Sequence, residues 1–163
     1  MPAVFEKLAP AHRNQVIDIF NHYIENSFAA YPETKVPYSF FDLFLGLAAK
    51  YPAVAAVDED GTVIAFALLR PYHPMPAFSR TAEITYFIAP GRTGRGLGGR
   101  LLAHLENEAR ALGIDVILAD ISSLNEGSIA FHAKNGFGEC GRFEKVGRKF
   151  GRDFDQVWMR KAL

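Results

Sequence analysis

The feature that most constrains the fold of this chain is a glycine-rich loop between an expected strand and an expected helix. The stretch APGRTGRGLGG, residues 89–99, contains five glycines. The residues before it, 81–88, have the composition of a strand, and the apolar residues after it recur at helical spacing up to Leu112. A helix that starts from such a loop has free backbone N–H groups and a favourable dipole for an anion. The loop therefore predicts an α/β fold that binds a phosphate-bearing ligand.

The rest of the chain supplies the other elements of a layered fold. Strands are expected at residues 4–8, 53–57, 63–69, 81–88, 116–121, 141–150 and 154–160, and helices at residues 13–26, 39–50, 97–112 and 126–134. Ser39 is the expected N-cap of the second helix. This order predicts an α/β fold with a mixed sheet, and the length of 163 residues predicts a single domain over residues 1–163.

Composition narrows the function classes. Lys and Arg number 18, as do Asp and Glu, so the net charge of zero predicts neither a nucleic-acid nor a membrane-surface partner. The longest strongly apolar run, residues 63–69, is too short to cross a bilayer. A single cysteine, Cys140, excludes an internal disulfide and favours a cytoplasmic protein. The histidines show no metal-ligand spacing, so no metal is expected.

Three classes of phosphate ligand compete for the loop. It ends in Gly-Gly-Arg and not in the Gly-Lys-Ser/Thr of a magnesium nucleotide site. Gly94, Gly96 and Gly99 match the dinucleotide pattern G-x-G-x-x-G, and Asp120 stands where a ribose-binding acid is expected. That pattern should open a series of βαβ units, whereas here a hairpin precedes it and only one such unit follows. The third class is the pyrophosphate of coenzyme A.

Two motifs resemble the Gcn5-related N-acetyltransferase (GNAT) superfamily. IAP followed by TGRGLG, residues 88–98, resembles its acetyl-CoA loop, and NEGSIAFHAKNGF, residues 125–137, resembles its other signature. The stretches FNHYIENS, residues 20–27, and VGRKFG, residues 146–151, are similar to the phosphinothricin and methionine sulfone acetyltransferase branch. The resemblance implies a GNAT fold: a mixed, mostly antiparallel central sheet with splayed parallel strands and helices on both faces.

The resemblance also implies the cosubstrate and its site. Acetyl-CoA would lie between residues 81–88 and 116–121 and transfer its acetyl group directly to the primary amine of a small molecule. An amino-acid analogue such as methionine sulfone, methionine sulfoximine or phosphinothricin is the implied acceptor. The residues that match the cofactor-binding positions are Tyr86, Phe87, Ile88, Gly94, Arg95, Gly96, Leu97, Gly98, Gly99 and Asn125. Thr93 replaces the usual Gln or Arg of the loop.

Two residues match catalytic positions of the branch. An amine must lose a proton before it attacks a thioester, and Glu83 lies where the branch carries its general base. The alternative for Glu83 is a strand carboxylate in a surface ion pair. His132 lies near the expected departing sulfur, where it could protonate the thiolate or relay a proton. The alternative for His132 is a histidine that only packs beside Phe131.

The acceptor site is the least defined part of the prediction. Met75 stands where the branch usually has an arginine for an acceptor carboxylate, and Arg70 and Arg80 flank it as possible replacements or as surface charges. A peptide or protein N-terminal acetyltransferase and a non-catalytic CoA-binding sensor are the alternative functions. Relatives in this branch are commonly dimers, so the resemblance also implies a homodimer.

Overall fold

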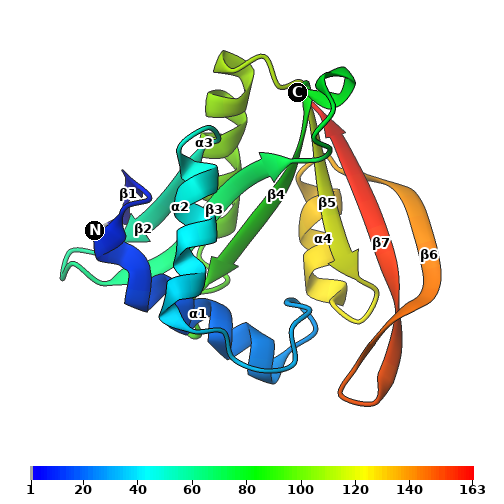
Figure 1. Cartoon of the computed structure of the whole chain (residues 1–163), viewed down its shortest axis with the longest axis horizontal. Helices are drawn as coiled ribbons and strands as arrows, with labels where there is room; N and C mark the ends of the chain where they lie inside the picture. The colour runs from blue at the N-terminus through cyan, green and yellow to red at the C-terminus, as the bar shows by residue number, and fades with distance from the viewer. Residues whose placement is uncertain (1) are drawn as a thin grey trace.

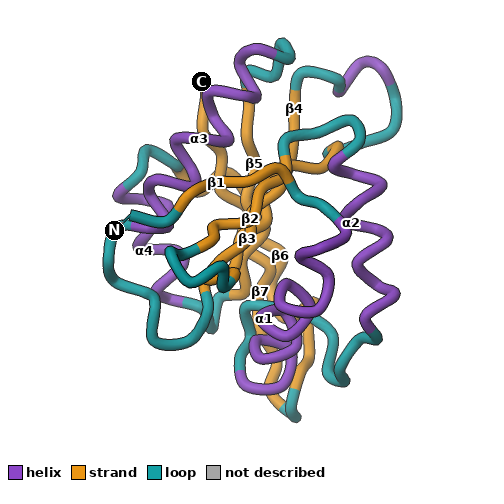
Figure 2. Tube along the Cα trace, turned by 90° about the vertical axis from the view of Figure 1, so that its left-hand side faces the viewer, coloured by secondary structure: helices purple, strands orange, loops and turns teal. Residues whose placement is uncertain are grey.

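A computed structural model describes residues 2–163, which form one seven-stranded sheet with helices on both faces (Figures 1 and 2). The strand order is β1-β2-β3-β4-β5-β7-β6. The strands are β1 (Val4–Lys7), β2 (Ala53–Val57), β3 (Val63–Pro71), β4 (Thr81–Ile88), β5 (Val116–Ser122), β6 (Gly138–Lys149) and β7 (Arg152–Ala162). The helices are α1 (Arg13–Asn26), α2 (Phe41–Ala48), α3 (Leu97–Ala111) and α4 (Glu126–Lys134), with short 3-10 turns at Pro10–His12, Tyr38–Phe40 and Pro76–Phe78. The predicted fold class is confirmed.

The centre of the sheet is split. Strands β4 and β5 are the one parallel pair among the described strands, and they pair only where Thr81, Ala82 and Glu83 face residues 116–118. Beyond this point β4 stays paired with β3, and β5 stays paired with β7. Figure 1 shows the two strands diverging. The edge of β4 that faces the gap thus keeps backbone groups that no neighbouring strand satisfies.

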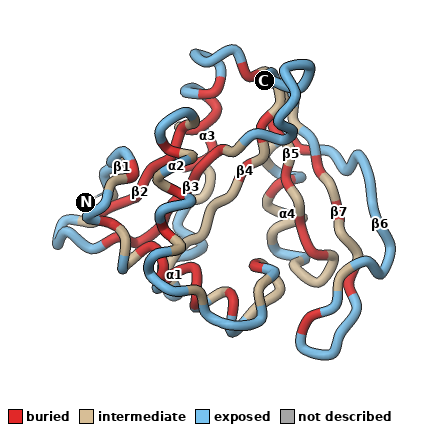
Figure 3. The backbone as a smooth tube through the Cα atoms, viewed as in Figure 1, coloured by how far each residue is buried: buried red, intermediate tan, exposed pale blue. Residues whose placement is uncertain are grey.

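Helices α1 and α2 cover one face of the sheet, and α3 and α4 cover the other (Figure 2). Side chains alternate between the faces along each strand. On β3, Phe66 and Leu68 pack with α1 and α2, whereas Ala67 and Leu69 pack towards α3. Strand β2 is buried along its whole length because both of its faces are covered, whereas the outer strand β6 is exposed along most of its length (Figure 3).

The expected elements are all present, with three differences. The second helix begins at Phe41 after a 3-10 turn, and the capping prediction for Ser39 is wrong because the N-cap is Phe40 and no side chain caps it. Leu112 lies beyond the end of α3 and is 57% exposed, so it is not part of the buried stripe. Strands β6 and β7 are longer than expected because each pairs with the other far from the turn.

Candidate active site

A cavity of about 860 Å³ lies at the gap between β4 and β5. Its lining comes from both faces of the sheet: Tyr31 and Phe44 belong to the α1/α2 side, and Gly98 and Phe131 belong to the α3/α4 side. The split in the sheet therefore connects the two faces. A ligand in the cavity can contact α3 and α4 on one side and the α1/α2 surface on the other.

The glycine loop forms the wall of this cavity on the α3/α4 side. Gly96 is the N-cap of α3 and has a left-handed backbone, with φ of 75°, which a residue with a Cβ adopts only with strain. Within residues 2–163, the first-turn N–H groups of Leu97, Gly98 and Gly99 donate to no backbone acceptor. Added to the helix dipole, these donors make the start of α3 suitable for a pyrophosphate.

Gly98 also permits close packing between two helices. A Cβ at Gly98 would lie 3.2 Å from the ring of Phe131 on α4 and 3.6 Å from Ile88 on β4. The small residue therefore brings the start of α3 against both α4 and the end of β4. The start of α3, the end of β4 and helix α4 therefore meet at one place.

The end of β4 forms the adjoining wall. Tyr86, Phe87 and Ile88 all line the cavity, and the hydroxyl of Tyr23 on α1 donates to the carbonyl oxygen of Ile88 over 2.6 Å. Asn125, which also lines the cavity, caps α4 by accepting a hydrogen bond from the backbone N–H of Ser128. This side-chain bond makes Asn125 the N-cap of α4.

His132 and Tyr86 form a buried pair on the α3/α4 side. Nδ1 of His132 lies 2.7 Å from the carbonyl oxygen of Ser128, so that nitrogen carries the proton. The other nitrogen, Nε2, then accepts from the hydroxyl of Tyr86 over 2.5 Å. Burial lowers the pKa of His132 and raises the pKa of the Tyr86 phenol. Both groups are therefore neutral at physiological pH, and Nε2 is an acceptor.

Glu83 and Arg70 form an ion pair on the α1/α2 side. The two residues are register partners on β4 and β3, and Nε of Arg70 donates to a carboxylate oxygen of Glu83 over 2.6 Å. The side chain of Glu83 is 12% exposed and that of Arg70 is 43% exposed, so the carboxylate is largely covered while the guanidinium reaches solvent. Arg70 lines the cavity, whereas Glu83 is not one of the lining residues.

A second polar group lies on the same side. The hydroxyl of Tyr31 donates to one oxygen of Asp120 over 2.6 Å, and the amide of Gln156 donates to the other over 2.9 Å. Asp120 and Tyr31 line the cavity. Burial, and after it the hydrogen bond to Asp120, raises the pKa of Tyr31, so its hydroxyl remains a donor. From the sequence, Asp120 was linked only to a dinucleotide ribose, and Tyr31 was not singled out.

The loop that carries Tyr31 is held in place by a buried lysine. Lys149 lies at the end of β6, is 1% exposed, and donates from Nζ to the carbonyl oxygens of Ile24, Ser27 and Ala30 over 2.6–2.7 Å. The ring of Tyr31 stacks on Phe154 of β7 at 5.5 Å. The terminal hairpin thus supports one wall of the cavity. A lysine within a glycine-rich hairpin motif was the only sequence signal for this contact.

Several predicted site residues lie away from the cavity lining. Met75 is 60% exposed beside a 3-10 turn, and Arg80 is exposed and paired with Asp115. Arg95 is exposed on the glycine loop. Leu97 is buried in the core, where it contributes packing and not a side-chain contact to a ligand. Of the three residues expected at the acceptor, the structure brings only Arg70 to the cavity.

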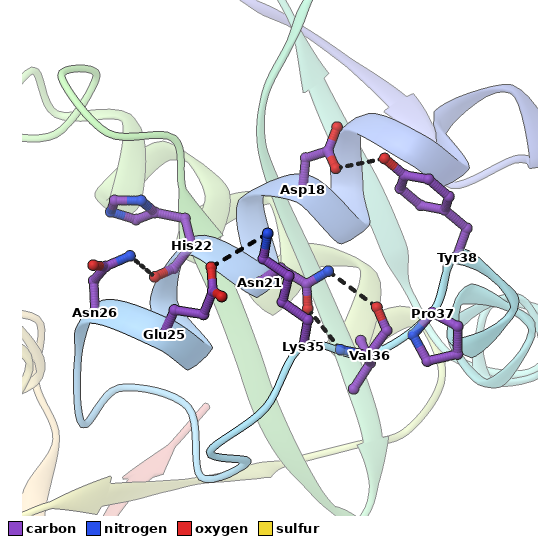
Figure 4. Close-up of a pocket in the computed structure, with 9 residues that line it drawn as sticks. All are labelled: Asp18, Asn21, His22, Glu25, Asn26, Lys35, Val36, Pro37 and Tyr38. Atoms are coloured by element: carbon purple, nitrogen blue, oxygen red, sulfur yellow. Dashed lines mark hydrogen bonds and ion pairs between the residues drawn. The ribbon is translucent and has the colours of Figure 1, made fainter. Parts of the chain in front are cut away.

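A second cavity, of about 410 Å³, lies between α1 and the loop that follows it (Figure 4). Several of its polar side chains pair with one another or with the loop backbone. Asn21 bonds both the N–H and the carbonyl of Val36, Tyr38 donates to Asp18, and Lys35 pairs with Glu25 at 3.5 Å. These contacts fasten the loop to α1.

Residues 2–163 show neither a metal-ligand cluster nor a membrane-spanning helix. No cluster of three or more His, Cys, Asp or Glu side chains in this part of the chain could hold a metal ion. None of the described helices is long and apolar enough to cross a membrane.

Comparison with known proteins shows which family and which solved structures the chain is similar to. Residues 16–137 match the acetyltransferase (GNAT) family. The chain is 33% identical to an L-methionine sulfoximine/L-methionine sulfone acetyltransferase of Pseudomonas paraeruginosa, over 91% of this chain and 87% of that protein. The structure of a GNAT superfamily phosphinothricin acetyltransferase from Sinorhizobium meliloti in complex with AcCoA is similar with a TM-score of 0.94 and 30% identity, covering 100% of this chain and 89% of that one. A ribosomal-protein-alanine N-acetyltransferase from Brucella melitensis is similar with a TM-score of 0.91 and 33% identity, covering 98% and 99%.

Proposed function

The chain belongs to the acetyltransferase (GNAT) family and is an N-acetyltransferase, and on that premise we propose that it transfers acetyl from acetyl-CoA to the primary amine of a small amino-acid analogue. The observation that carries the proposal is the cavity through the split sheet, with an anion site at one end and ionisable side chains at the other. Methionine sulfone, methionine sulfoximine and phosphinothricin are the candidate acceptors, because the relatives named above act on such compounds.

The α3/α4 side suits the cosubstrate. Free N–H groups at the start of α3 would bind the pyrophosphate, and the unpaired edge of β4 would bind the pantetheine arm. A Cβ at Gly98 would press on Phe131, so this position is shaped by backbone and not by side chains. Acetyl-CoA supplies the thioester carbonyl that the acceptor amine attacks.

Glu83 is proposed to take the proton that the amine must lose. One proton of the acceptor ammonium passes to Glu83 through water, because Glu83 is not among the residues that line the cavity. The free amine then attacks: the nitrogen–carbon bond forms, the carbon–sulfur bond breaks, and the second nitrogen proton passes to the departing thiolate. Arg70 stabilises the negative charge of Glu83. Its other guanidinium N–H groups have no acceptor among the described residues and suit an acceptor carboxylate.

His132 is proposed to position Tyr86 and not to donate a proton itself. Its Nε2 already accepts from Tyr86, and its one ring proton is directed at the carbonyl of Ser128. The departing thiolate needs little help, since a thiol has an ordinary pKa of about 8.5. The pair would instead hold the β4 side of the cavity in shape.

A second candidate is acetylation of a protein or peptide N-terminus, which the Brucella melitensis structure favours. Against it, the loop that carries Tyr31 forms part of the cavity wall on the α1/α2 side, where a peptide chain would have to pass. Comparing turnover of short alanine peptides with turnover of L-methionine sulfone separates these two acceptor classes. Size-exclusion chromatography with light scattering tests the expected homodimer.

The test of the proposed function is the release of free CoA thiol from acetyl-CoA in the presence of each candidate acceptor. Wild-type turnover should favour one amino-acid analogue, and Glu83→Gln should lower kcat by about 10²–10⁴-fold at neutral pH. Glu25→Gln, in the second cavity, is the matched control and should leave kcat unchanged. A Glu83→Gln enzyme with wild-type kcat would show that Glu83 is not the base.

A further inference from the structure

Asp120 is a carboxylate of the cavity that the proposed chemistry does not yet use. It lies on β5, lines the cavity, and accepts hydrogen bonds from Tyr31 and Gln156, which are both neutral donors. Among residues 2–163 no Lys, Arg or His nitrogen lies within 4.0 Å of its oxygens, because Arg70 is paired with Glu83. Its negative charge therefore faces the cavity without an ion-pair partner.

Strand register places Asp120 on the same face as Glu83 and Arg70. Glu83 is the register partner of Leu118 on β5 and of Arg70 on β3. Asp120 follows Leu118 by two residues, so its side chain points to the same face of the sheet.

We propose that Asp120 binds the ammonium group of the acceptor, so that the enzyme selects amines that arrive as cations. The carboxylate lines the cavity at the diverging end of β5, past the last residues that pair with β4. Each of its oxygens accepts one hydrogen bond and has capacity for another. The inference rests on the proposed function, because it assigns a substrate-binding role within that same cavity.

Together with Arg70 this assignment defines the chemical class of the acceptor. Arg70 offers guanidinium N–H groups to a carboxylate, and Asp120 offers a carboxylate to an ammonium, from strands on the two sides of β4. An α-amino acid carries both complementary charges, on two groups attached to the same carbon. The face therefore fits a zwitterionic amino acid better than an uncharged amine or an amine that lacks a carboxylate.

The experiment measures binding without turnover. L-methionine sulfone is titrated by calorimetry into enzyme saturated with CoA, which has no acetyl group to transfer. Asp120→Asn should weaken Kd by about tenfold or more, since hydrogen bonds to charged groups contribute about 1.5–3 kcal/mol. Asp120→Glu, which keeps the charge, should recover part of the affinity. Asp153→Asn, an exposed aspartate on β7, is the matched control.

Two further measurements separate charge recognition from a structural role. The 2-hydroxy analogue of methionine sulfone has no ammonium, so wild type and Asp120→Asn should bind it equally. Tyr31→Phe removes the hydrogen bond to Asp120 but keeps the charge, so it should cost less affinity than Asp120→Asn. Equal losses for both ligands, or equal effects of Tyr31→Phe and Asp120→Asn, would overturn the assignment. So would unchanged affinity in Asp120→Asn, or the absence of wild-type affinity for L-methionine sulfone.

Measurements of CoA thiol release distinguish a failure of the ammonium site from a failure of the proposed function, on which the ammonium site rests. If wild type binds L-methionine sulfone but releases no CoA thiol from acetyl-CoA with any amine, the proposed function fails while the ammonium site stands. If wild type turns over and Asp120→Asn has the same KM for the acceptor, the function stands and the ammonium site fails. The KM for acetyl-CoA should stay unchanged in Asp120→Asn, because the cosubstrate lies on the other side of the gap.

Discussion

The two sides of the gap between β4 and β5 differ in the groups that they present to the cavity: mostly backbone groups on one side and side chains on the other. On the α3/α4 side the groups that we propose for ligand binding are mostly backbone N–H groups at the start of α3 and along the edge of β4. On the α1/α2 side they are side chains from β3, β5 and a long loop, represented by Arg70, Asp120 and Tyr31. One cavity thus joins a backbone site to a side-chain site.

This difference indicates that substitutions can alter the binding of one ligand while the binding of the other is retained. A backbone site depends on local geometry and tolerates side-chain variation, whereas a side-chain site changes specificity with each substitution. The replacement of the usual loop Gln or Arg by Thr93 leaves the N–H groups at the start of α3 in place. On the other side, Met75 stands where the branch has an arginine, and it lies exposed and away from the cavity. We therefore expect acceptor and cosubstrate binding to respond to different substitutions.

The largest effect is expected on the side-chain half, at Lys149. Lys149→Met would leave three carbonyl oxygens without their donor, namely those of Ile24, Ser27 and Ala30. Loss of such a buried network should lower the free energy of unfolding by about 3 kcal/mol. Urea denaturation measures this loss, and the KM for the acceptor should rise more than the KM for acetyl-CoA. Lys50→Met, at an exposed position, should change neither.

The backbone half is disturbed by Gly96→Ala. The φ of 75° at this N-cap is strained for alanine, at a cost of about 1–2 kcal/mol, and relief of the strain would turn the first N–H groups of α3. The KM for acetyl-CoA should therefore rise severalfold while the KM for the acceptor changes little. Gly46→Ala in α2 is the contrasting control, since nothing lies within 4 Å of the added Cβ and the helix should gain about 0.5–1 kcal/mol. An equal rise in both KM values would contradict the division into two halves.

A smaller effect is expected from Tyr86→Phe, at the pair that Tyr86 forms with His132 on the α3/α4 side. The change removes the donor to Nε2 of His132 and should lower the free energy of unfolding by about 1 kcal/mol. Because we assign Tyr86 to shape and not to proton transfer, kcat should fall only a few-fold, as measured by CoA thiol release. A loss of about 10³-fold in kcat, with the protein still folded, would instead indicate direct proton transfer by Tyr86.

The smallest effect is a dependence of stability on pH through His132. Burial lowers its pKa in the folded protein, so the unfolded chain binds a proton first as the pH falls. The stabilising contribution is present above the unfolded pKa of about 6.5 and is lost between that value and the lower folded pKa. Denaturation of wild type and His132→Gln across pH 5–8 measures it, and the variant should show a flatter profile. Equal slopes would assign the dependence to other groups.

Much of the backbone half could be predicted from the sequence. Glycines at residues 91–99, a strand before them and an amphipathic helix after them determine the anion site by local geometry alone. The Asn125 cap of α4 was equally local, since the side chain bonds to an N–H three residues later. The failed Ser39 cap shows the limit of such signals, because a 3-10 turn intervenes before α2 and moves the N-cap to Phe40.

The side-chain site on the α1/α2 side could not be predicted from the sequence, because it is formed by contacts between residues distant in the chain. Tyr31 and Asp120 are 89 residues apart and Lys149 and Ala30 are 119 apart, so no spacing in the sequence signals either contact. Similarly, contacts with Ser128 and Tyr86 determine which ring nitrogen of His132 carries the proton, and the sequence motif does not reveal this. In the sequence, Arg70 and Arg80 are equivalent candidates for the acceptor carboxylate. In the structure, Arg70 lines the cavity, whereas Arg80 is paired with Asp115.

The amino-acid sequence by itself determined the order of elements, the glycine loop and the family, because these rest on periodicity and on short motifs that act within one turn or one strand. Tertiary structure decided where the sheet splits, which charges meet across it, and which carboxylate faces the cavity. The physical reason is that backbone groups are positioned by local dihedral angles. The environment of a side chain, by contrast, is set by whichever strands and loops the fold brings beside it.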